Sequence, residues 1–371
     1  MKSIHSGRLE RWLGPQGIAE LSRLGRGWYG PPIHLLDVPG SVRVCGDGDF
    51  VGTFERGYFA SSFDVLSEHL KRLARGRASH GQFGSGFAGV ADYLYKVKQG
   101  YSQKLSYSKA PTGTGTGAPW SAWRITGSPS FPGQGTSPAI DGSGVVCTAA
   151  TAGALPYNNP ATGTMHLTTV EGNWSSSNLS NMLIYDRLWH VGKTMSSVAT
   201  EAVNTNNLPT RYTNTVAGSV DSVEGNFVFA SVEVTLGATA HNWTVCKYTN
   251  QGGVTGQSLP SFAGVASSGA DRVDHTGPGY WFAPLASGDT GIKNLTQMQC
   301  DASVTGTLNF AIGHPIGFCY FPVSQLWFPQ DWITNRNQAP RVFDNACLAV
   351  LWLSTIGGGQ GQMTIELTNA P

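Results

Sequence analysis

Charged side chains are scarce in this sequence. Lys, Arg, Asp and Glu make up 13% of the 371 residues, with 24 basic and 23 acidic side chains. A solitary domain in solution usually carries more charge, whereas surfaces that become buried against neighbouring chains are depleted of it. Hydrophobic residues reach 40% and aromatic residues 11%, enough apolar surface to offset the entropy cost of ordering the chain. We therefore expect a folded subunit of an assembly.

Closely spaced cysteines and long apolar runs are also absent. No two of the six cysteines lie within four residues of one another, which excludes zinc-ribbon and C-x-x-C redox pairs. Most of them fall within apolar strands, so we expect free core thiols and no disulfide framework. No run of 18 apolar residues occurs, and we expect neither a membrane-spanning helix nor a secretory signal.

Recognisable catalytic and ligand-binding motifs are missing as well. The nine histidines form no H-E-x-x-H pattern, and there is no G-x-S-x-G elbow. The G-x-G-x-x-G match at 84–89 lacks the preceding strand that a dinucleotide site needs. Cys45-Gly-Asp-Gly-Asp49 lacks the further ligands of a calcium loop and is typical of a hairpin turn. We expect no enzymatic activity, no cofactor and no metal.

Two regions of opposite charge are present. Residues 1–109 hold 15 Lys and Arg against 9 Asp and Glu, a net charge of +6, and the remainder holds 9 against 14, a net charge of −5. The apolar spacing predicts short helical turns over 8–24 and a helix over 62–75. We expect a basic, helix-containing anchor region at 1–110, a Gly/Thr/Pro linker at 111–119 and a β-rich body at 120–371.

The body alternates with period two, which is typical of half-buried strands. The expected strands are 143–149, 164–170, 182–189, 226–234, 242–248, 294–300, 307–312, 316–323, 347–353 and 361–368. Gly-, Asn- and Pro-rich turns separate them, and no helical pattern intervenes. This predicts a mainly β fold, an antiparallel β-sandwich that is jelly-roll-like, with one or two sandwich domains.

Several phrases resemble a family of virion structural proteins from tailed bacteriophages and prophages. They are Gly27-Trp-Tyr-Gly-Pro-Pro32, Asp47-Gly-Asp-Phe-Val-Gly52, Leu183-Ile-Tyr-Asp-Arg-Leu-Trp-His190, Trp281-Phe-Ala-Pro-Leu-Ala-Ser-Gly-Asp-Thr-Gly-Ile-Lys293 and Phe343-Asp-Asn-Ala-Cys-Leu-Ala-Val350. The resemblance spans most of the chain. It implies a structural role on the phage head as a capsid decoration or cement protein, with host cytoplasm as the place of assembly. The implied partners are the major capsid protein and further copies of this chain, as a homotrimer.

Candidate contact residues follow from this interpretation. They are Trp28, Tyr29, Pro31 and Pro32 in an aromatic elbow, Arg72 and Arg75 at the end of the predicted helix, and Leu183, Tyr185, Leu188 and Trp189 at the end of a strand. For the aromatic and apolar candidates, packing within the chain explains them equally well. Docking onto an acidic protein surface explains the basic residues as well as nucleic acid does, and we expect no nucleic-acid or membrane partner.

Three alternatives stay open at this stage. The first is the major capsid protein itself, whose widespread fold uses a long spine helix that this sequence does not predict. The second is a tail or fibre component that binds host glycans through exposed Trp and Tyr; exposed aromatic pairs in the body favour it and uniformly buried ones oppose it. The third is an enzyme such as a depolymerase, which needs carboxylates brought together by the fold.

Overall fold

The computed structural model describes the chain in segments. These are the backbone of 33–38, 41–46 and 49–55, and residues 87, 90–110, 119–123, 125–129, 144–175, 180–203, 208–276, 281–321, 326–333, 339–354 and 360–370. The chain divides into two compact units, Met1–Gly81 and Gln82–Pro371. Each is described by itself.

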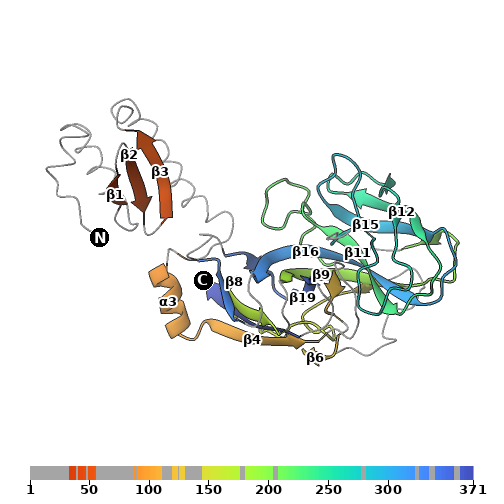
Figure 1. The fold of residues 1–371 in the computed structure, drawn as a ribbon, viewed down its shortest axis with the longest axis horizontal. Coiled ribbons are helices and arrows are strands. Elements are labelled where there is room, and N and C mark those ends of the chain that lie inside the picture. The colour runs from red at the N-terminus through yellow and green to blue at the C-terminus, as the bar shows by residue number, and fades with distance from the viewer. Residues whose placement is uncertain are drawn as a thin grey trace. The chain divides into compact units, whose positions relative to one another are not determined.

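The first unit contains a three-stranded antiparallel sheet that the sequence did not predict. Strands β1 (Ile33–Val38), β2 (Ser41–Gly46) and β3 (Asp49–Glu55) lie in the order β1-β2-β3 (Figure 1). Gly46 pairs with Asp49, which confirms the hairpin turn expected at 45–49. The helices expected at 8–24 and 62–75 lie outside the described residues, as do the candidate contacts there: Trp28, Tyr29, Pro31, Pro32, Arg72 and Arg75.

In the second unit, one sheet is built on three strands far apart in sequence. Its order is β17 (Phe328–Asp331), β8 (Thr164–Trp174), β20 (Gly361–Ala370), β4 (Ser102–Lys109) and β6 (Gly127–Ser128), and β18 (Arg341–Val342) also pairs with β8. A nine-residue helix, α3 (Val90–Lys98), precedes β4.

A second sheet lies at the centre of this unit. Its order is β11 (Phe227–Val234), β16 (Thr307–Phe321), β9 (Ser180–Thr194), β19 (Leu348–Ser354) and β5 (Trp120–Ser121), and β7 (Val145–Val146) also pairs with β9. The 15-residue strands β9 and β16 run side by side along it (Figure 1).

A third sheet covers the other end of the unit. Its order is β10 (Glu201–Ala202), β15 (Ile292–Cys300), β12 (Asn242–Asn250) and β13 (Gln257–Ser258), and β14 (Phe262–Ala263) also pairs with β12. Every strand pair in the described sheets is antiparallel. The mainly β antiparallel sandwich predicted from the sequence is confirmed.

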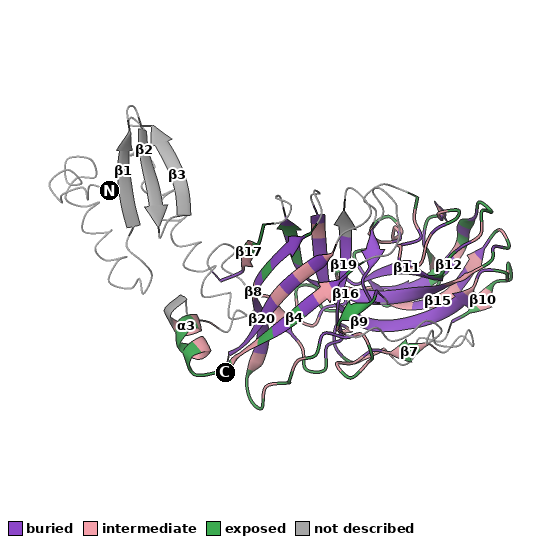
Figure 2. Cartoon of the chain, turned by 60° about the horizontal axis from the view of Figure 1, so that its bottom comes forward, coloured by how far each residue is buried: buried purple, intermediate pink, exposed green. Residues whose placement is uncertain are grey.

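Aromatic contacts join the three sheets into one core. Trp174 of β8 meets Trp352 of β19 edge-to-face, with ring centroids 4.9 Å apart. Trp243 of β12 meets Phe310 of β16 in the same way at 4.7 Å. The central sheet is therefore covered by different sheets at its two ends, and its strands are buried along most of their length (Figure 2). Such pairs contribute about 0.5–1.5 kcal/mol each beyond the burial of their area.

The division between the units differs from the boundary that charge suggested. Strand β4 lies in the basic stretch before residue 110, yet it pairs with β20 from Ser102↔Thr368 to Lys109↔Gly361. Its alternate residues Leu105 and Tyr107 are buried, and so is Lys109, whose ammonium donates to the carbonyl of Ile125 at 2.7 Å. The basic composition of this stretch therefore did not mark a domain boundary. The alternation of buried and exposed residues in β4 places it in the sheet of the second unit. The linker expected at 111–119 lies outside the described residues except for its last position.

Candidate functional site

A β-bulge in β9 brings two polar side chains to one face of the central sheet. Trp189 pairs with Ile312 and Arg187 with Gly313, so Leu188 has no residue opposite it. Successive side chains of a regular strand alternate between faces, and residues 187 and 190 would point to opposite sides. The extra residue changes this phase. Arg187 Nε therefore reaches His190 and donates to its Nδ1 at 3.0 Å.

The Arg187 side chain is completely buried. Its Nη1 donates to the Tyr185 hydroxyl at 3.2 Å, and its guanidinium lies 4.7 Å from the centre of the Trp123 ring. Nη2 has no hydrogen-bond partner within the described part of the chain. None of the ion pairs formed among the described residues includes Arg187. A desolvated cation–π contact recovers about 2 kcal/mol, which is less than the cost of burying an unbalanced charge.

Beside it lies a buried ion pair between Asp186 and Arg211. Arg211 donates through Nε to Oδ2 at 2.5 Å and through Nη2 to Oδ1 at 3.0 Å. Burial raises the pKa of Asp186, and the contacts with Arg211 only partly offset that effect. Burial lowers the pKa of Arg211, but the hydrogen bonds and charge of Asp186 outweigh it and the net change is a raised pKa. Asp186 therefore depends on Arg211 to stay ionised in this buried position.

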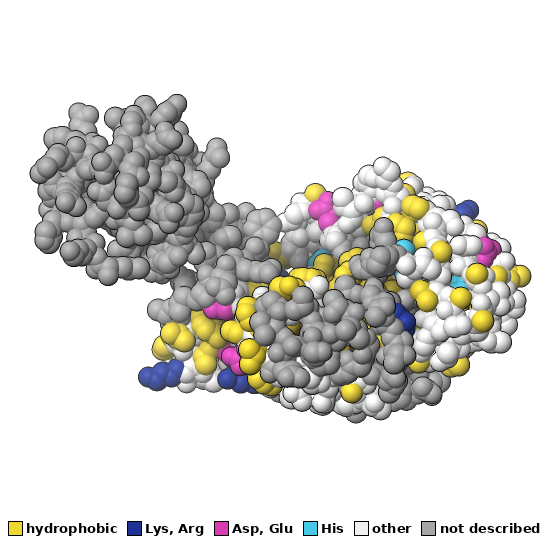
Figure 3. All heavy atoms as spheres, in the orientation of Figure 1, with side chains coloured by type: hydrophobic (Ala, Val, Ile, Leu, Met, Phe, Trp, Pro, Cys, Tyr) yellow, Lys and Arg dark blue, Asp and Glu magenta, His cyan; other side chains and the backbone are white. Residues whose placement is uncertain are grey.

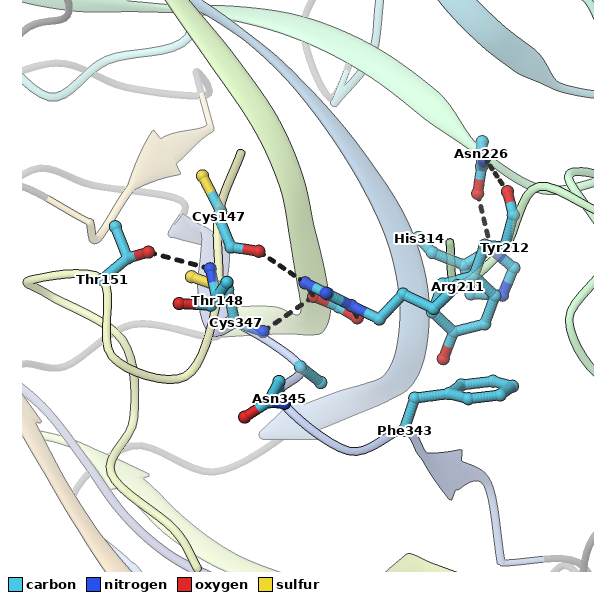
Figure 4. Close-up of polar contacts among 12 residues, drawn as sticks. Cys147, Thr148, Thr151, Arg211, Tyr212, Asn226, His314, Phe343, Asn345 and Cys347 are labelled. Atoms are coloured by element: carbon cyan, nitrogen blue, oxygen red, sulfur yellow. Dashed lines mark hydrogen bonds and ion pairs between the residues drawn. The ribbon is translucent and has the colours of Figure 1, made fainter. Parts of the chain in front are cut away.

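The same ion pair positions two cysteines. Arg211 Nη2 donates to the carbonyl of Cys147 at 2.7 Å, and the backbone N–H of Cys347 donates to Asp186 Oδ1 at 2.8 Å. In Figure 4 the guanidinium end of Arg211 points toward both cysteines, while Tyr212 lies at its other end. The Asp186 carboxylate thus connects Arg211, Cys147 and Cys347, which are far apart in the sequence: it binds Arg211 and Cys347 directly, and Arg211 in turn binds Cys147.

Cys147 and Cys347 lie at the junction of two strands along one edge of β9. β19 pairs with residues 180–186 of β9 and β7 with residues 189–190. Between them, the N–H of Arg187 donates to the Cys347 carbonyl at 2.8 Å, and the N–H of Cys147 donates to the Leu188 carbonyl at 3.0 Å. Both thiols are fully buried, and the Cys147 thiol donates to the carbonyl of Val145 at 3.8 Å. They belong to a small hydrophobic cluster on this face of the sheet.

The surroundings of the two thiols shift their pKa values in opposite directions. Burial raises the pKa of Cys147, but the neighbouring Cys347, His190 and Arg187 together outweigh burial, and the net pKa lies well below the usual value. Burial and the neighbouring Cys147 raise the pKa of Cys347. The surroundings therefore act in opposite directions on the pKa values of these two thiols.

A second buried polar cluster closes a loop onto β12. Asp274 Oδ2 lies 3.0 Å from His241 Nε2 and accepts a 2.8 Å hydrogen bond from Trp243 Nε1, and its Oδ1 accepts from the N–H of Val265 at 2.8 Å. A Cβ on Gly264 would lie 2.0 Å from His241 Nε2, so the close approach requires glycine. Each polar atom of the Asp274 carboxylate is used in holding the loop, which is a structural role.

The strand residues predicted as contacts lie inside the protein. Leu183, Tyr185, Leu188 and Trp189 are all buried. Leu183 and Tyr185 pack in the small cluster around Trp123, and Leu188 and Trp189 pack in the main core. These four side chains therefore pack within the chain, because β9 is a central strand covered on both faces. The informative signal in this segment was the charged pair Asp186-Arg187 inside an apolar run.

Most tryptophans are also buried. Those with buried side chains are Trp120, Trp123, Trp174, Trp189, Trp243, Trp332 and Trp352. Among the described residues, Trp281 is half-buried and Trp327 is 52% exposed. The aromatic content of the body therefore reflects packing first.

An exposed aromatic strip remains on the second half of β16. Phe318 and Tyr320 are 41% and 44% exposed and alternate with buried Cys319 and Phe321. The Phe318 ring lies 6.2 Å from the half-buried Trp281 ring at an angle of 72°. We call Trp281, Phe318 and Tyr320 the aromatic strip. Charged side chains are few on the described surface of the body in Figure 3, and an aromatic strip in such surroundings is typical of a contact surface.

Cys147, Cys246, Cys300 and Cys347 are buried free thiols, as the sequence predicted, and Cys319 is also buried. No group of three or more His, Cys, Asp or Glu side chains in the described segments is placed to hold a metal ion. Within the same segments, no helix has the length and apolar character needed to cross a membrane.

Comparisons with known proteins add no family. No family model and no curated protein matches the chain. One solved structure, of the infectious bursal disease virus Gt strain, aligns with 73% of this chain and 81% of that chain at 8% identity and a TM-score of 0.15. A TM-score this low carries no argument about fold or function.

Proposed function

We propose that this chain is a non-enzymatic virion structural protein of a tailed bacteriophage, a capsid decoration or cement protein. It docks on the coat lattice through its basic N-terminal region and contacts copies of itself through the body. The observation that carries the proposal is the aromatic strip on a β-sandwich whose surface is poor in charge. Such a surface favours burial against other protein chains.

The charge distribution supports a division of labour. The first unit, residues 1–81, holds 11 Lys and Arg against 8 Asp and Glu, a net charge of +3, and the second unit holds 13 against 15, a net charge of −2. Opposite charges speed association and set its orientation more than they add affinity. A basic region that docks on an acidic coat and a nearly uncharged body that packs against its copies together fit a closed trimer.

The helix content supports decoration over the alternative of the major capsid protein. The widespread coat-protein fold of tailed phages uses a long spine helix. The helix α3 has nine residues, and it is the only helix among the residues that the structure describes.

The copy number of this polypeptide in purified particles tests the proposal. Quantitative mass spectrometry normalised to the coat protein is expected to give a ratio near that of the coat. A ratio of a few copies per particle would place the chain in the tail instead, and its absence from particles would refute a virion role.

Replacing Phe318 and Tyr320 together with Ser is expected to weaken attachment or self-association by roughly 30-fold or more. Truncating two central aromatic contacts costs about 2 kcal/mol or more in an interface. The unfolding free energy should change little, because both side chains are exposed. The measurement is occupancy on particles together with analytical ultracentrifugation of the free protein. Val254→Ser, at a 53% exposed position just after the turn at 250–253, is the matched control and should behave as wild type.

Glycan binding by a tail or fibre component is a second candidate, because the Trp281–Phe318 pair offers an aromatic platform. The same variant separates the two functions. If Phe318→Ser with Tyr320→Ser abolishes binding to a host-glycan array and leaves oligomeric state and particle occupancy unchanged, the strip binds sugar and the decoration proposal loses its main support.

A further inference from the structure

The buried guanidinium of Arg187 has neutral hydrogen-bond partners. Its Nε donates to His190 Nδ1 at 3.0 Å, and its Nη1 donates to the Tyr185 hydroxyl at 3.2 Å. Because a guanidinium can only donate, Nδ1 of His190 is the accepting, unprotonated nitrogen and that ring is neutral. A phenol is also neutral near pH 7, since its ordinary pKa is about 10. Neither partner supplies the negative charge that would balance Arg187.

The neighbouring carboxylate does not supply that charge either. Both oxygens of Asp186 accept hydrogen bonds from Arg211, and Oδ1 also accepts from the backbone N–H of Cys347. None of the ion pairs formed among the described residues includes Arg187. A guanidinium keeps its proton in proteins, and a buried charge without a counter-charge is strongly unfavourable. Arg187 therefore needs one negative charge beside it.

The free donors of Arg187 lie on Nη2. This nitrogen carries two of the five N–H donors of a guanidinium, it is buried, and it has no acceptor in the segments that the structure describes. The centres of the Trp123 and Phe229 rings lie 4.7 and 5.8 Å from the guanidinium carbon, and both rings belong to the small hydrophobic cluster. A water molecule at Nη2 would accept a hydrogen bond and leave the charge unbalanced, whereas an anion supplies both the acceptor and the charge.

We propose that Nη2 of Arg187 anchors a buried site for one small monovalent anion, of which chloride is the simplest member. One negative charge matches the one unbalanced guanidinium, and a divalent anion such as sulfate would leave a charge of the opposite sign. Because the surroundings are apolar, a weakly hydrated anion costs less to bury than a strongly hydrated one. The Arg187 side chain is completely buried, so the anion exchanges by local opening of the structure. This inference is independent of the proposed virion role.

The dependence of stability on chloride tests the proposal. The full chain is unfolded with urea and followed by tryptophan fluorescence, at constant ionic strength, while chloride replaces gluconate over about a hundredfold range of concentration. An anion that binds only the folded chain lowers the unfolding equilibrium constant by the factor 1 + [Cl−]/Kd. Above Kd, each tenfold rise in chloride should therefore lower that constant about tenfold, which is the slope for one site per chain. An unfolding constant that does not change with chloride would overturn the proposal.

Two variants assign the effect to Arg187. Arg187→Met keeps an apolar stem, removes the guanidinium and should abolish the chloride dependence. Lys104→Met is the matched control, because it removes a cation at an exposed position of β4, and it should keep the wild-type slope. A slope that persists in Arg187→Met would place the anion elsewhere and refute the site. Loss of the slope in both variants would reveal a general effect of charge and refute the site as well.

Diffraction from crystals of the wild-type protein grown in bromide locates the anion directly. Bromide is a monovalent halide with an anomalous signal, and its peak should lie within hydrogen-bond distance of Arg187 Nη2. Bromide peaks at exposed lysines alone, an adventitious ion only, would overturn the proposal, and so would the lack of any peak. This measurement decides the question even if Arg187→Met fails to fold.

Discussion

Replacing Asp186 with Asn is expected to lower the free energy of unfolding of the body by about 3–5 kcal/mol, the usual cost of breaking a buried ion pair by removing one partner. The variant leaves Arg211 without its carboxylate and places a second uncompensated guanidinium beside Arg187. It also weakens the acceptor for the backbone N–H of Cys347. A domain is commonly stable by only about 5–15 kcal/mol, so this variant should approach global unfolding.

Chemical denaturation followed by tryptophan fluorescence measures this effect. Glu171→Gln removes an acidic side chain at an exposed position of β8 and should stay within about 0.5 kcal/mol of wild type. A double variant, Asp186→Leu with Arg211→Met, should recover part of the loss because no orphan charge of the pair remains. If Asp186→Asn behaves as Glu171→Gln does, the ion pair does not organise the cluster.

Acidification should begin to destabilise the body near pH 6.5, above the range in which ordinary carboxylates titrate. Burial lowers the pKa of His166 to about 4 and that of His314 to about 3. His314 stacks on Tyr212 with ring centroids 3.7 Å apart, and its Nδ1 donates to Asn226 Oδ1 at 2.8 Å. His166 Nδ1 donates to the carbonyl of Ala339 at 3.1 Å. Both sites hold a neutral imidazole.

The sign follows from the lowered folded-state pKa values. Above pH 6.5 both rings are neutral in the folded and unfolded chain, and their full contribution to stability is present. As the pH falls below 6.5, the unfolded chain takes up protons that the folded chain refuses, and stability is lost until the pH reaches about 4 for His166 and about 3 for His314. At about pH 4.5 the two rings together cost about 5 kcal/mol at most.

Urea midpoints measured between about pH 7 and pH 4.5 test this expectation. His166→Gln and His314→Gln should each remove about half of the pH dependence, whatever they do to stability at neutral pH. The raised pKa of Asp186 acts in the opposite direction, because the folded chain then takes up that proton more readily. The comparison of variant and wild-type slopes isolates the histidines. Parallel slopes in all three proteins would contradict their role.

Strand positions were the most predictable part of the structure. The expected strands 226–234 and 361–368 correspond to β11 (Phe227–Val234) and β20 (Gly361–Ala370), because their side-chain alternation is a local property of the sequence. The expected pair 307–312 and 316–323 proved to be one strand, β16. Gly313 and Pro315 between them are usual strand breakers, but here they lie at two register shifts opposite β9, where an irregular ladder accommodates them.

Charge was a poor guide to domain organisation. The basic residues before 110 suggested one anchor region, but β4 within it is a strand of the sandwich. Backbone hydrogen bonds with β20 and the burial of alternate side chains hold β4 in the sheet. The net charge of the segment contributes little to either. The three-stranded sheet β1-β2-β3 was missed for a related reason, because turn and aromatic residues around it hid a short period-two pattern.

By itself, the sequence determined the β class, the antiparallel sandwich and the buried free thiols, because alternation, turn residues and cysteine spacing are local features. Only the tertiary structure decided which polar residues meet. Cys347 binds a carboxylate 161 positions away in the chain, and Arg187 meets His190 because Leu188 is bulged. The cluster depends on the register of β9 against β16, β19 and β7, and register is set by the packing of all the strands together. No local pattern in the chain carries that information.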